Sequence, residues 1–178
     1  DYGTDASLST GAHITIEAIV KREGDGATGT ILDYICDKGL DAGYEFAIFR
    51  GNLKPWCRLA NAASSIAVAF DTAITNDNFF YLGVVLDGTN ILCYQQGLPD
   101  GSDSWIGGDI RTNAAHLYGG GRGIDNDRIF NGSTGELRIS NTPRSAAWLK
   151  ATYHTCWDNL LTFAESMPIS NVSRRARP

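Results

Sequence analysis

The side chains best suited to bind a ligand are concentrated in GRGIDNDRIFNG, which spans residues 121–132. Carboxylate oxygens are the ligands that calcium prefers in proteins, so Asp125 and Asp127 are candidate calcium ligands. Amide, carboxylate and guanidinium groups also form hydrogen bonds with sugar hydroxyls. The candidate ligand contacts in this stretch are Arg122, Asp125, Asn126, Asp127 and Arg128. An Asx-rich turn that binds nothing is the alternative, because Asp and Asn side chains stabilise turns.

Trp105 is a second candidate, because it lies in a polar, glycine-rich segment, residues 97–112, that predicts a long loop. An indole exposed in such a loop offers a flat apolar surface against which a sugar ring can pack. The alternative is that Trp105 closes one end of the core. Trp56 and Trp148 lie in a predicted strand and a predicted helix, so we expect both in the core.

Length and charge restrict the classes of function. The chain has 178 residues, which suits one domain, and a net charge of −5. We expect no nucleic-acid binding, which needs a basic surface. No apolar run is long enough to cross a membrane. The domain is expected over residues 1–165 and a polar tail or linker over 166–178. Asn131 and Asn171 each begin a glycosylation acceptor triplet.

Apolar and polar residues alternate along most of the chain, which predicts strands that would position these side chains. One face of HITIEAIVK, residues 13–21, carries Ile14, Ile16, Ala18 and Val20. The other face carries His13, Thr15 and Glu17, and we expect it to be solvated unless it is a concave, ligand-binding face. About nine such strands, separated by short turns, predict an all-β fold with two antiparallel sheets in a sandwich.

One segment predicts a helix near the C-terminus. Thr142 is a suitable N-cap and Pro143 a suitable first helical residue. Ala146, Leu149 and Tyr153 then recur at helical spacing, so one face of the helix can pack on the sandwich.

The four cysteines are Cys36, Cys57, Cys93 and Cys156. The absence of a C-x-x-C pair argues against a zinc ribbon or a redox motif. Their even number permits two disulfides in any of three connectivities, and buried free thiols within strands are the alternative.

Four stretches together resemble the laminin-G-like, concanavalin A-like lectin/glucanase superfamily: ITIEAIVK, GYEFAIFRGN, FFYLGVVLDGTNILCYQQG and NGSTGELRISNTPRSAAWLKATY. The likeness covers residues 14–153 and is greatest to modules of bacterial, archaeal and phage surface proteins. Its most specific part is the strand GELRISN followed by Arg144, Ser145 and Trp148. Ile19 departs from the family pattern, in which an aromatic residue is usual. The resemblance implies a jelly-roll sandwich of two antiparallel sheets with one short C-terminal helix.

Some members of this superfamily are retaining glycosidases with two carboxylates at E-x-D-x-x-E spacing. The nearest match here begins at Glu23 and has Thr28 in the last position, so we expect no catalytic residues and no enzyme. The resemblance therefore implies an extracellular or surface-exposed binding or adhesion module for a glycan, with calcium as the candidate cofactor. A structural subunit of a phage particle, surface layer or filament that contacts neighbouring protein subunits is the alternative. A divergent glycoside hydrolase or polysaccharide lyase is a third hypothesis.

Overall fold

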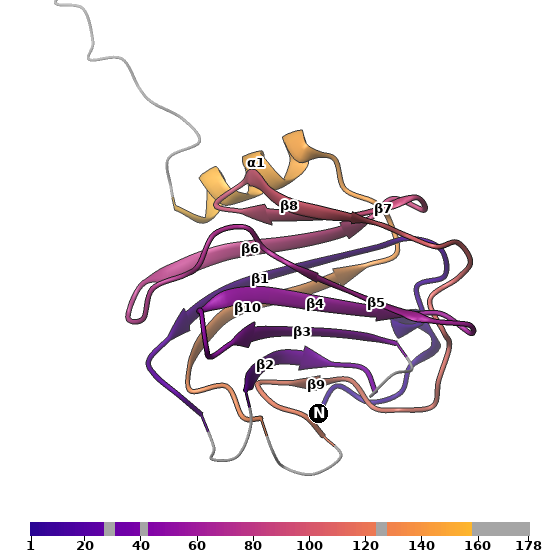
Figure 1. The fold of residues 1–178 in the computed structure, drawn as a ribbon, viewed down its shortest axis with the longest axis horizontal. Coiled ribbons are helices and arrows are strands. Elements are labelled where there is room, and N and C mark those ends of the chain that lie inside the picture. Colours follow the sequence, from indigo (N-terminus) through magenta and orange to yellow (C-terminus); the bar gives the residue numbers. More distant parts are fainter. Residues whose placement is uncertain (27–30, 40–42, 124–127, 158–178) are drawn as a thin grey trace, which may run out of the picture.

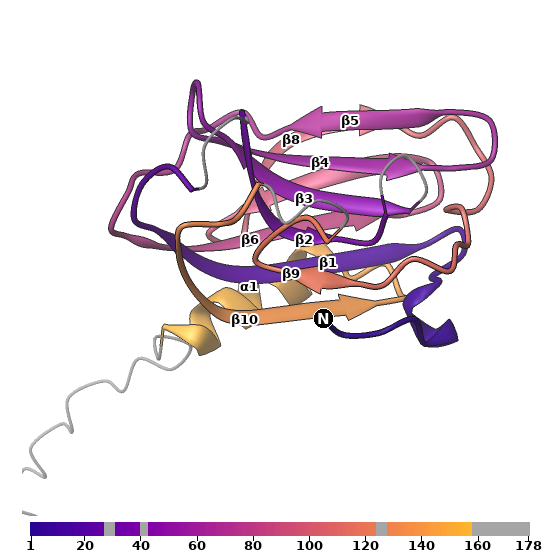
Figure 2. The same ribbon diagram turned by 90° about the horizontal axis from the view of Figure 1, so that it is seen from below.

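Two five-stranded antiparallel sheets packed face to face form the computed structural model of this chain (Figure 1, Figure 2). The structure describes residues 1–26, 31–39, 43–123 and 128–157. Sheet A contains, in spatial order, β10 (Gly132–Ser140), β1 (Ile14–Arg22), β6 (Phe79–Leu86), β7 (Asn90–Gln95) and β8 (Leu98–Ser104). Sheet B contains β5 (Ser65–Ala69), β4 (Lys54–Ala60), β3 (Tyr44–Phe49), β2 (Leu32–Asp37) and β9 (Tyr118–Gly119). The short helix η1 (Ala6–Leu8) precedes β1, and α1 (Ala146–Cys156) follows β10. The predicted all-β, two-sheet sandwich with one C-terminal helix is confirmed.

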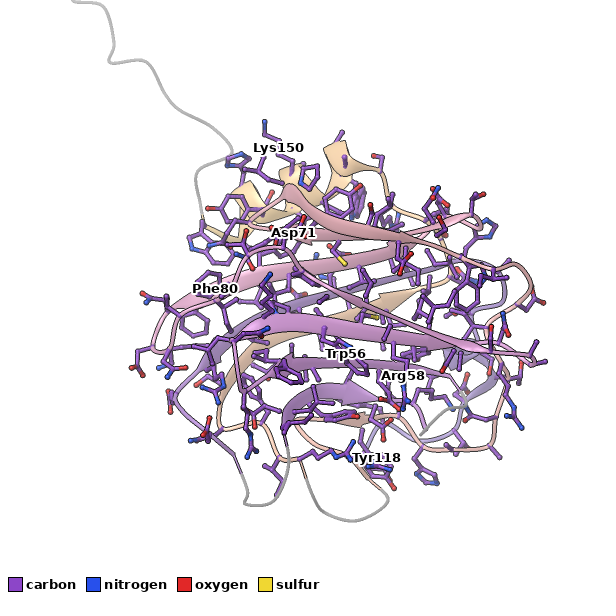
Figure 3. All side chains as sticks on the ribbon, viewed as in Figure 1. Trp56, Arg58, Asp71, Phe80, Tyr118 and Lys150 are labelled. Atoms are coloured by element: carbon purple, nitrogen blue, oxygen red, sulfur yellow. The ribbon has the colours of Figure 1, made fainter. Side chains whose placement is uncertain are left out.

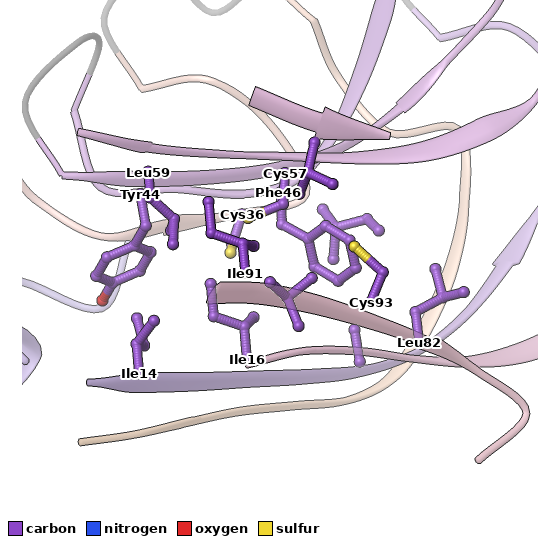
Figure 4. Packing of buried hydrophobic residues seen from close by; sticks show 14 of the residues in the cluster. Ile14, Ile16, Cys36, Tyr44, Phe46, Cys57, Leu59, Leu82, Ile91 and Cys93 are labelled. Carbon is purple, nitrogen blue, oxygen red and sulfur yellow. The ribbon is translucent and has the colours of Figure 1, made fainter. Parts of the chain in front are cut away.

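The core lies between the two sheets and follows the predicted alternation. The predicted inward residues of β1 are all buried: Ile14, Ile16, Ala18 and Val20. Figure 4 shows Ile14 facing Tyr44 of the opposite sheet. Each fully buried aliphatic side chain contributes about 1.5–3 kcal/mol by leaving water. This burial holds the two sheets together and fixes which side of each strand faces outward.

The predicted loop over residues 97–112 is partly wrong, because its first half is strand β8. The sequence of β8, LPDGSDS, is polar and mostly exposed, and it has no apolar alternation. It pairs with β7 through the backbone, with Leu98 opposite Gln95 and Ser104 opposite Asn90. An edge strand of this kind needs backbone hydrogen bonds but no buried face, so its side chains give little signal.

Helix α1 begins later than predicted. Its N-cap is Ser145, whose hydroxyl oxygen accepts a hydrogen bond from the Trp148 backbone N–H at 3.2 Å. The Thr142 carbonyl instead accepts a hydrogen bond from the Thr15 hydroxyl at 2.7 Å. That hydroxyl also accepts from the Arg144 backbone N–H at 2.9 Å, so residues 142–144 are tied to β1 before the helix starts.

The predicted packing face of α1 is correct in part. Leu149 is fully buried against the outer face of sheet A, together with Tyr81 and Tyr94, and Tyr153 packs at the edge of this cluster. Ala146 is exposed. The expectation that Trp148 belongs to the core is wrong, because 45% of this residue is exposed and its ring lies 4.2 Å from the Arg144 guanidinium.

The face of β1 that carries Thr15 and Glu17 is not solvated, contrary to the expectation. Both residues are buried on the side of sheet A that α1 covers. The Glu17 carboxylate accepts a hydrogen bond from the Tyr81 hydroxyl at 2.6 Å, which satisfies the buried charge in part. The helix therefore closes much of this face, and the outer face of sheet B becomes the better place to look for a binding site.

All four cysteines are free thiols. Three of these thiols are buried within strands: Cys36, Cys57 and Cys93. This agrees with the alternative of buried free thiols rather than disulfides. Cys156 is exposed near the end of α1. Burial raises the pKa of the Cys93 thiol to about 12, so this thiol stays protonated and unreactive. Across the described ranges, no helix is both long enough and apolar enough to span a bilayer.

Candidate functional site

The outer face of sheet B is built by the alternation of β3 and β4. On β3, Phe46 and Ile48 point into the core, so Glu45 between them points outward. On β4, Cys57 and Leu59 point into the core. The neighbouring side chains of Trp56 and Arg58 therefore point outward. The antiparallel register places Glu45 opposite Arg58 and Ala47 opposite Trp56. Figure 3 shows Trp56 and Arg58 near each other over β4, with Tyr118 of β9 on the same face.

Glu45 organises this face. One carboxylate oxygen accepts from the Arg58 Nη2 at 2.5 Å, and the other accepts from the Tyr34 hydroxyl at 2.9 Å. The Arg58 guanidinium lies 5.8 Å from the centre of the Trp56 ring. Burial and the charge of Glu45 raise the pKa of Tyr34 to about 12, so its hydroxyl remains a neutral donor. Glu45 thus holds Arg58 in place beside the Trp56 ring.

Residues 119–123 and 128–130 lie along β2 and bring two predicted residues to this face. The Tyr34 backbone N–H donates to the Arg128 carbonyl at 3.0 Å, and the Gly120 N–H donates to the Ile35 carbonyl at 2.9 Å. The Arg128 side chain then covers Tyr34, with its Nη1 3.0 Å from the hydroxyl and its guanidinium 5.6 Å from the ring centre. Arg128 adopts a positive φ of 58°, a conformation that is uncommon for a residue other than glycine.

Asp37 is the second carboxylate on this face, directly opposite Glu45 in the register and paired on its other side with Tyr118. Burial, and then the charge of Glu45, raises the pKa of Asp37 to about 6. The Gly39 backbone N–H donates to its carboxylate at 3.0 Å, and the charge of the buried Arg122 opposes the rise. Arg122 and Arg128, 6 positions apart in the sequence, therefore both interact with residues of β2.

The structure separates Trp105 from this face. The expected exposure of Trp105 is wrong: it is only 6% exposed, belongs to the core cluster, and donates its indole N–H to the Gly108 carbonyl at 2.9 Å. This geometry fits the alternative in which Trp105 closes one end of the core. Asp125, Asn126, Asp127 and Asn171 lie outside the described residues.

Two further predicted features concern modification and metal binding. Asn131 is exposed, and its side-chain amide donates to the Asp25 carbonyl at 3.2 Å. Within the part of the chain that the structure describes, no group of three or more His, Cys, Asp or Glu residues could hold a metal ion. The calcium hypothesis therefore depends on Asp125 and Asp127, outside those residues.

Sequence reasoning missed the residues at the centre of this face: Trp56, Arg58, Glu45, Tyr34 and Asp37. The signal was present in KPWCRLA and GYEFAIFR, because an alternation that buries Cys57 and Phe46 must also turn Trp56 and Glu45 outward. The expectation that Trp56 belongs to the core, made because it lies in a predicted strand, is wrong, since its side chain is half-buried on the outer face. Its position on the strand, rather than its residue type, decides where it points.

A family model described as the Concanavalin A-like lectin/glucanases superfamily matches residues 3–150. The chain belongs to this superfamily. The match covers both sheets and the first turn of α1, and it agrees with the resemblance seen in the sequence. A search of curated proteins returned no match.

Solved structures share the fold of this superfamily member at low identity. A native heptameric SAP-like pentraxin from Limulus polyphemus has a TM-score of 0.58 and 12% identity, over 82% of this chain and 71% of that chain. A suspected carbohydrate-binding protein from Bacteroides ovatus has a TM-score of 0.62 and 16% identity, over 78% of this chain and 40% of that chain. The binding domain of Paraclostridial Mosquitocidal Protein 1 has a TM-score of 0.66 and 12% identity, over 88% and 40%. The chain thus spans about two fifths of the length of two of these proteins.

Proposed function

We propose that this chain is a non-catalytic, lectin-like module that binds a carbohydrate on the outer face of sheet B, at the surface of a cell or virion or in the extracellular space. The single observation that carries the proposal is the half-buried Trp56 ring beside an Arg58 side chain that Glu45 holds in place. The likeness to a suspected carbohydrate-binding protein and to a binding domain supports it at the level of the fold.

The chemistry of this face suits a sugar. One face of a pyranose ring is lined with C–H groups and packs on an aromatic ring, while its hydroxyls lie near the ring plane and need hydrogen-bond partners. Trp56 supplies the ring, and the Arg58 guanidinium, 5.8 Å from the centre of that ring, supplies hydrogen-bond donors. Because Glu45 already orders Arg58, little side-chain entropy is lost on binding.

The burial of the Asp37 and Glu45 carboxylates, and the hydrogen bonds of Glu45, support binding rather than hydrolysis. Asp37 and Glu45 are both buried, and Glu45 is occupied by Tyr34 and Arg58. A retaining glycosidase needs a carboxylate that can reach the sugar carbon and a second one that can exchange a proton with it. Because Glu45 is bonded to Arg58, it is better placed to position that arginine than to attack a substrate.

The direct test is a glycan array, probed with and without added calcium, followed by titration of the best ligand. We expect Trp56→Ala to weaken binding at least tenfold, because removal of a central aromatic contact typically costs about 2 kcal/mol or more. Trp148→Ala is the matched control, since Trp148 is exposed on α1 beyond sheet A, and it should leave affinity unchanged. Absence of binding in both conditions, or equal losses in both variants, would contradict the proposal.

The same experiment tests whether residues 121–128 bind calcium. We propose Asp125 and Asp127 as the calcium ligands, on the basis of their oxygen chemistry. Binding that depends on calcium and is lost in Asp125→Asn would support this role. Binding that is equal with and without calcium would remove it and leave the Trp56 face as the site.

A structural subunit that contacts neighbouring protein subunits is the second candidate function. The observation that favours it is the outer face of β5, where the small side chains of Ser65, Ala67 and Ala69 are all exposed. A stable assembly without any sugar affinity would favour this function over the lectin-like one.

A further inference from the structure

Cations reach the surface of sheet B on both sides of the Trp56 ring, in a chain whose net charge is −5. Along β4, Lys54, Trp56 and Arg58 are half-buried while the residues between them are buried, so all three side chains lie on the outer face. Alternate residues of a strand are about 7 Å apart, so one cation precedes the ring along β4 and the other follows it. Arg128 adds a further half-buried cation across the sheet, where its guanidinium covers Tyr34.

The carboxylates at the centre of this face lie beneath these cations. The Glu45 side chain is 2% exposed, whereas that of Arg58, to which it is bonded, is 19% exposed. Asp37 is buried, and its carboxylate accepts a hydrogen bond from the Gly39 backbone N–H. A ligand that approaches Trp56 therefore meets guanidinium and ammonium groups before it meets a carboxylate.

The neighbouring strand β5 leaves room for a ligand beside these side chains. Ala69 is opposite Trp56 and Ala67 is opposite Arg58, and both alanines are exposed. The Phe70 N–H donates to the Pro55 carbonyl at 2.9 Å, so the exposed Asp71 follows beside Lys54. Among the described residues, neither Lys54 nor Asp71 forms an ion pair. The Lys54 ammonium therefore has no internal carboxylate partner to exchange for a ligand.

We propose that the carbohydrate bound at Trp56 is an acidic polysaccharide whose sugars carry carboxylates, and that Lys54 and Arg58 bind those carboxylates while a sugar ring packs on the indole. This inference rests on the proposed lectin-like function and names its ligand class. Guanidinium and ammonium groups form charge-assisted hydrogen bonds with carboxylates, which are stronger than those with neutral hydroxyls. A neutral sugar would gain nothing from the charge of Lys54, whereas an acidic chain is also attracted to the face before contact.

The test uses pairs of probes that differ only in charge: oligomers of galacturonate, mannuronate and glucuronate, and the methyl ester of each. Calorimetric titrations in EDTA exclude bridging by calcium. We expect at least one acid to bind at least tenfold more tightly than its ester in about 0.05 M salt. The difference should shrink in about 0.5 M salt, because mobile ions screen exposed charges.

Variants of single charges assign the effect to this face. Lys54→Gln should weaken binding of the acid about threefold, the usual size for an exposed ion pair, and leave any binding of the ester unchanged. Asp71→Asn should strengthen binding of the acid about twofold, because it removes a like charge beside Lys54. Lys150→Gln is the matched control, since it removes the same charge from the exposed side of α1, and it should change neither affinity.

The outcomes separate this inference from the proposed function. If an ester or a neutral glycan of the array binds as tightly as every acid, the inference is overturned and the lectin-like function stands. If acids and neutral glycans all fail to bind, the proposed function fails as well. Equal effects of Lys54→Gln and Lys150→Gln, or equally tight binding of a single-stranded oligonucleotide of the same charge, would also overturn the inference.

Discussion

Asp37 is the residue on the candidate face whose charge responds to pH in the accessible range. Its carboxyl lies among Glu45 of β3, Tyr118 of β9 and Arg122 of the segment along β2. Burial and the charge of Glu45 raise its pKa from the ordinary value of 3.8 to about 6. Folding therefore favours the protonated form of Asp37 and disfavours the ionised form.

The stability of the protein should reflect this shift. The contribution of Asp37 to the free energy of unfolding is fully present below about pH 4 and is lost as the pH rises through about 6. We expect Asp37→Asn to gain stability relative to the wild type between pH 4 and pH 7. The gain is at most about 3 kcal/mol, at about 1.4 kcal/mol for each pKa unit, and water screening reduces it. Urea unfolding of both proteins at the two pH values measures it, and a difference independent of pH would contradict the assignment.

The tryptophans show what residue type can and cannot predict. Trp105, in a polar stretch, is buried, while Trp148, in a helix, is exposed. The local sequence around Trp105 does not show that Gly108 folds back to accept its indole N–H, nor that the core has a space for its ring at that end. These contacts join residues through the fold, so a pattern of neighbouring residues could not predict them.

At the scale of elements, α1 is attached to sheet A mainly through one side chain. Leu149 is fully buried, and its methyl groups lie against Gly83 of β6, where a Cβ atom would come within 3.4 Å. We expect Leu149→Ala to lower the free energy of unfolding by about 2–5 kcal/mol, the usual cost of a large-to-small change in a core. Ala147→Ser, on the exposed side of the same helix, should change it by less than about 0.5 kcal/mol. Chemical denaturation measures both, and equal effects would show that α1 does not pack through Leu149.

The elements that the sequence could predict are those with a buried face. Strand β1 was found from its alternating apolar residues, whereas β8 was not, because its pairing with β7 uses only the backbone. The start of α1 was misplaced for a similar reason. Thr142 and Ser145 are both good N-caps, and the choice between them depends on Thr15, which is 127 residues from Thr142 in the sequence.

At the scale of the whole molecule, the burial of three thiols gives a prediction about reactivity. Cys36, Cys57 and Cys93 lie in the core, and burial raises the pKa of each thiol well above its ordinary range. In the native protein a thiol-specific reagent should therefore modify Cys156 alone, and in urea it should modify all four cysteines. Mass spectrometry of the labelled protein counts the modified sites. Rapid native labelling of a second cysteine would contradict this packing.

The architecture could be predicted from the sequence, but most of the candidate site could not. Arg122 and Arg128 were identified from their residue types, and the structure brings both to sheet B. Their partners, Asp37 and Tyr34, come from β2, about 85 or more residues earlier in the chain. Only the return of residues 119–123 and 128–130 along β2 brings the groups together.

The position of α1 also determines the valency of the molecule. Because the helix packs on the outer face of sheet A, the proposed carbohydrate ligand would have only the outer face of sheet B as a flat binding surface. A chain with one such face can attach to a polymer surface but cannot cross-link two surfaces.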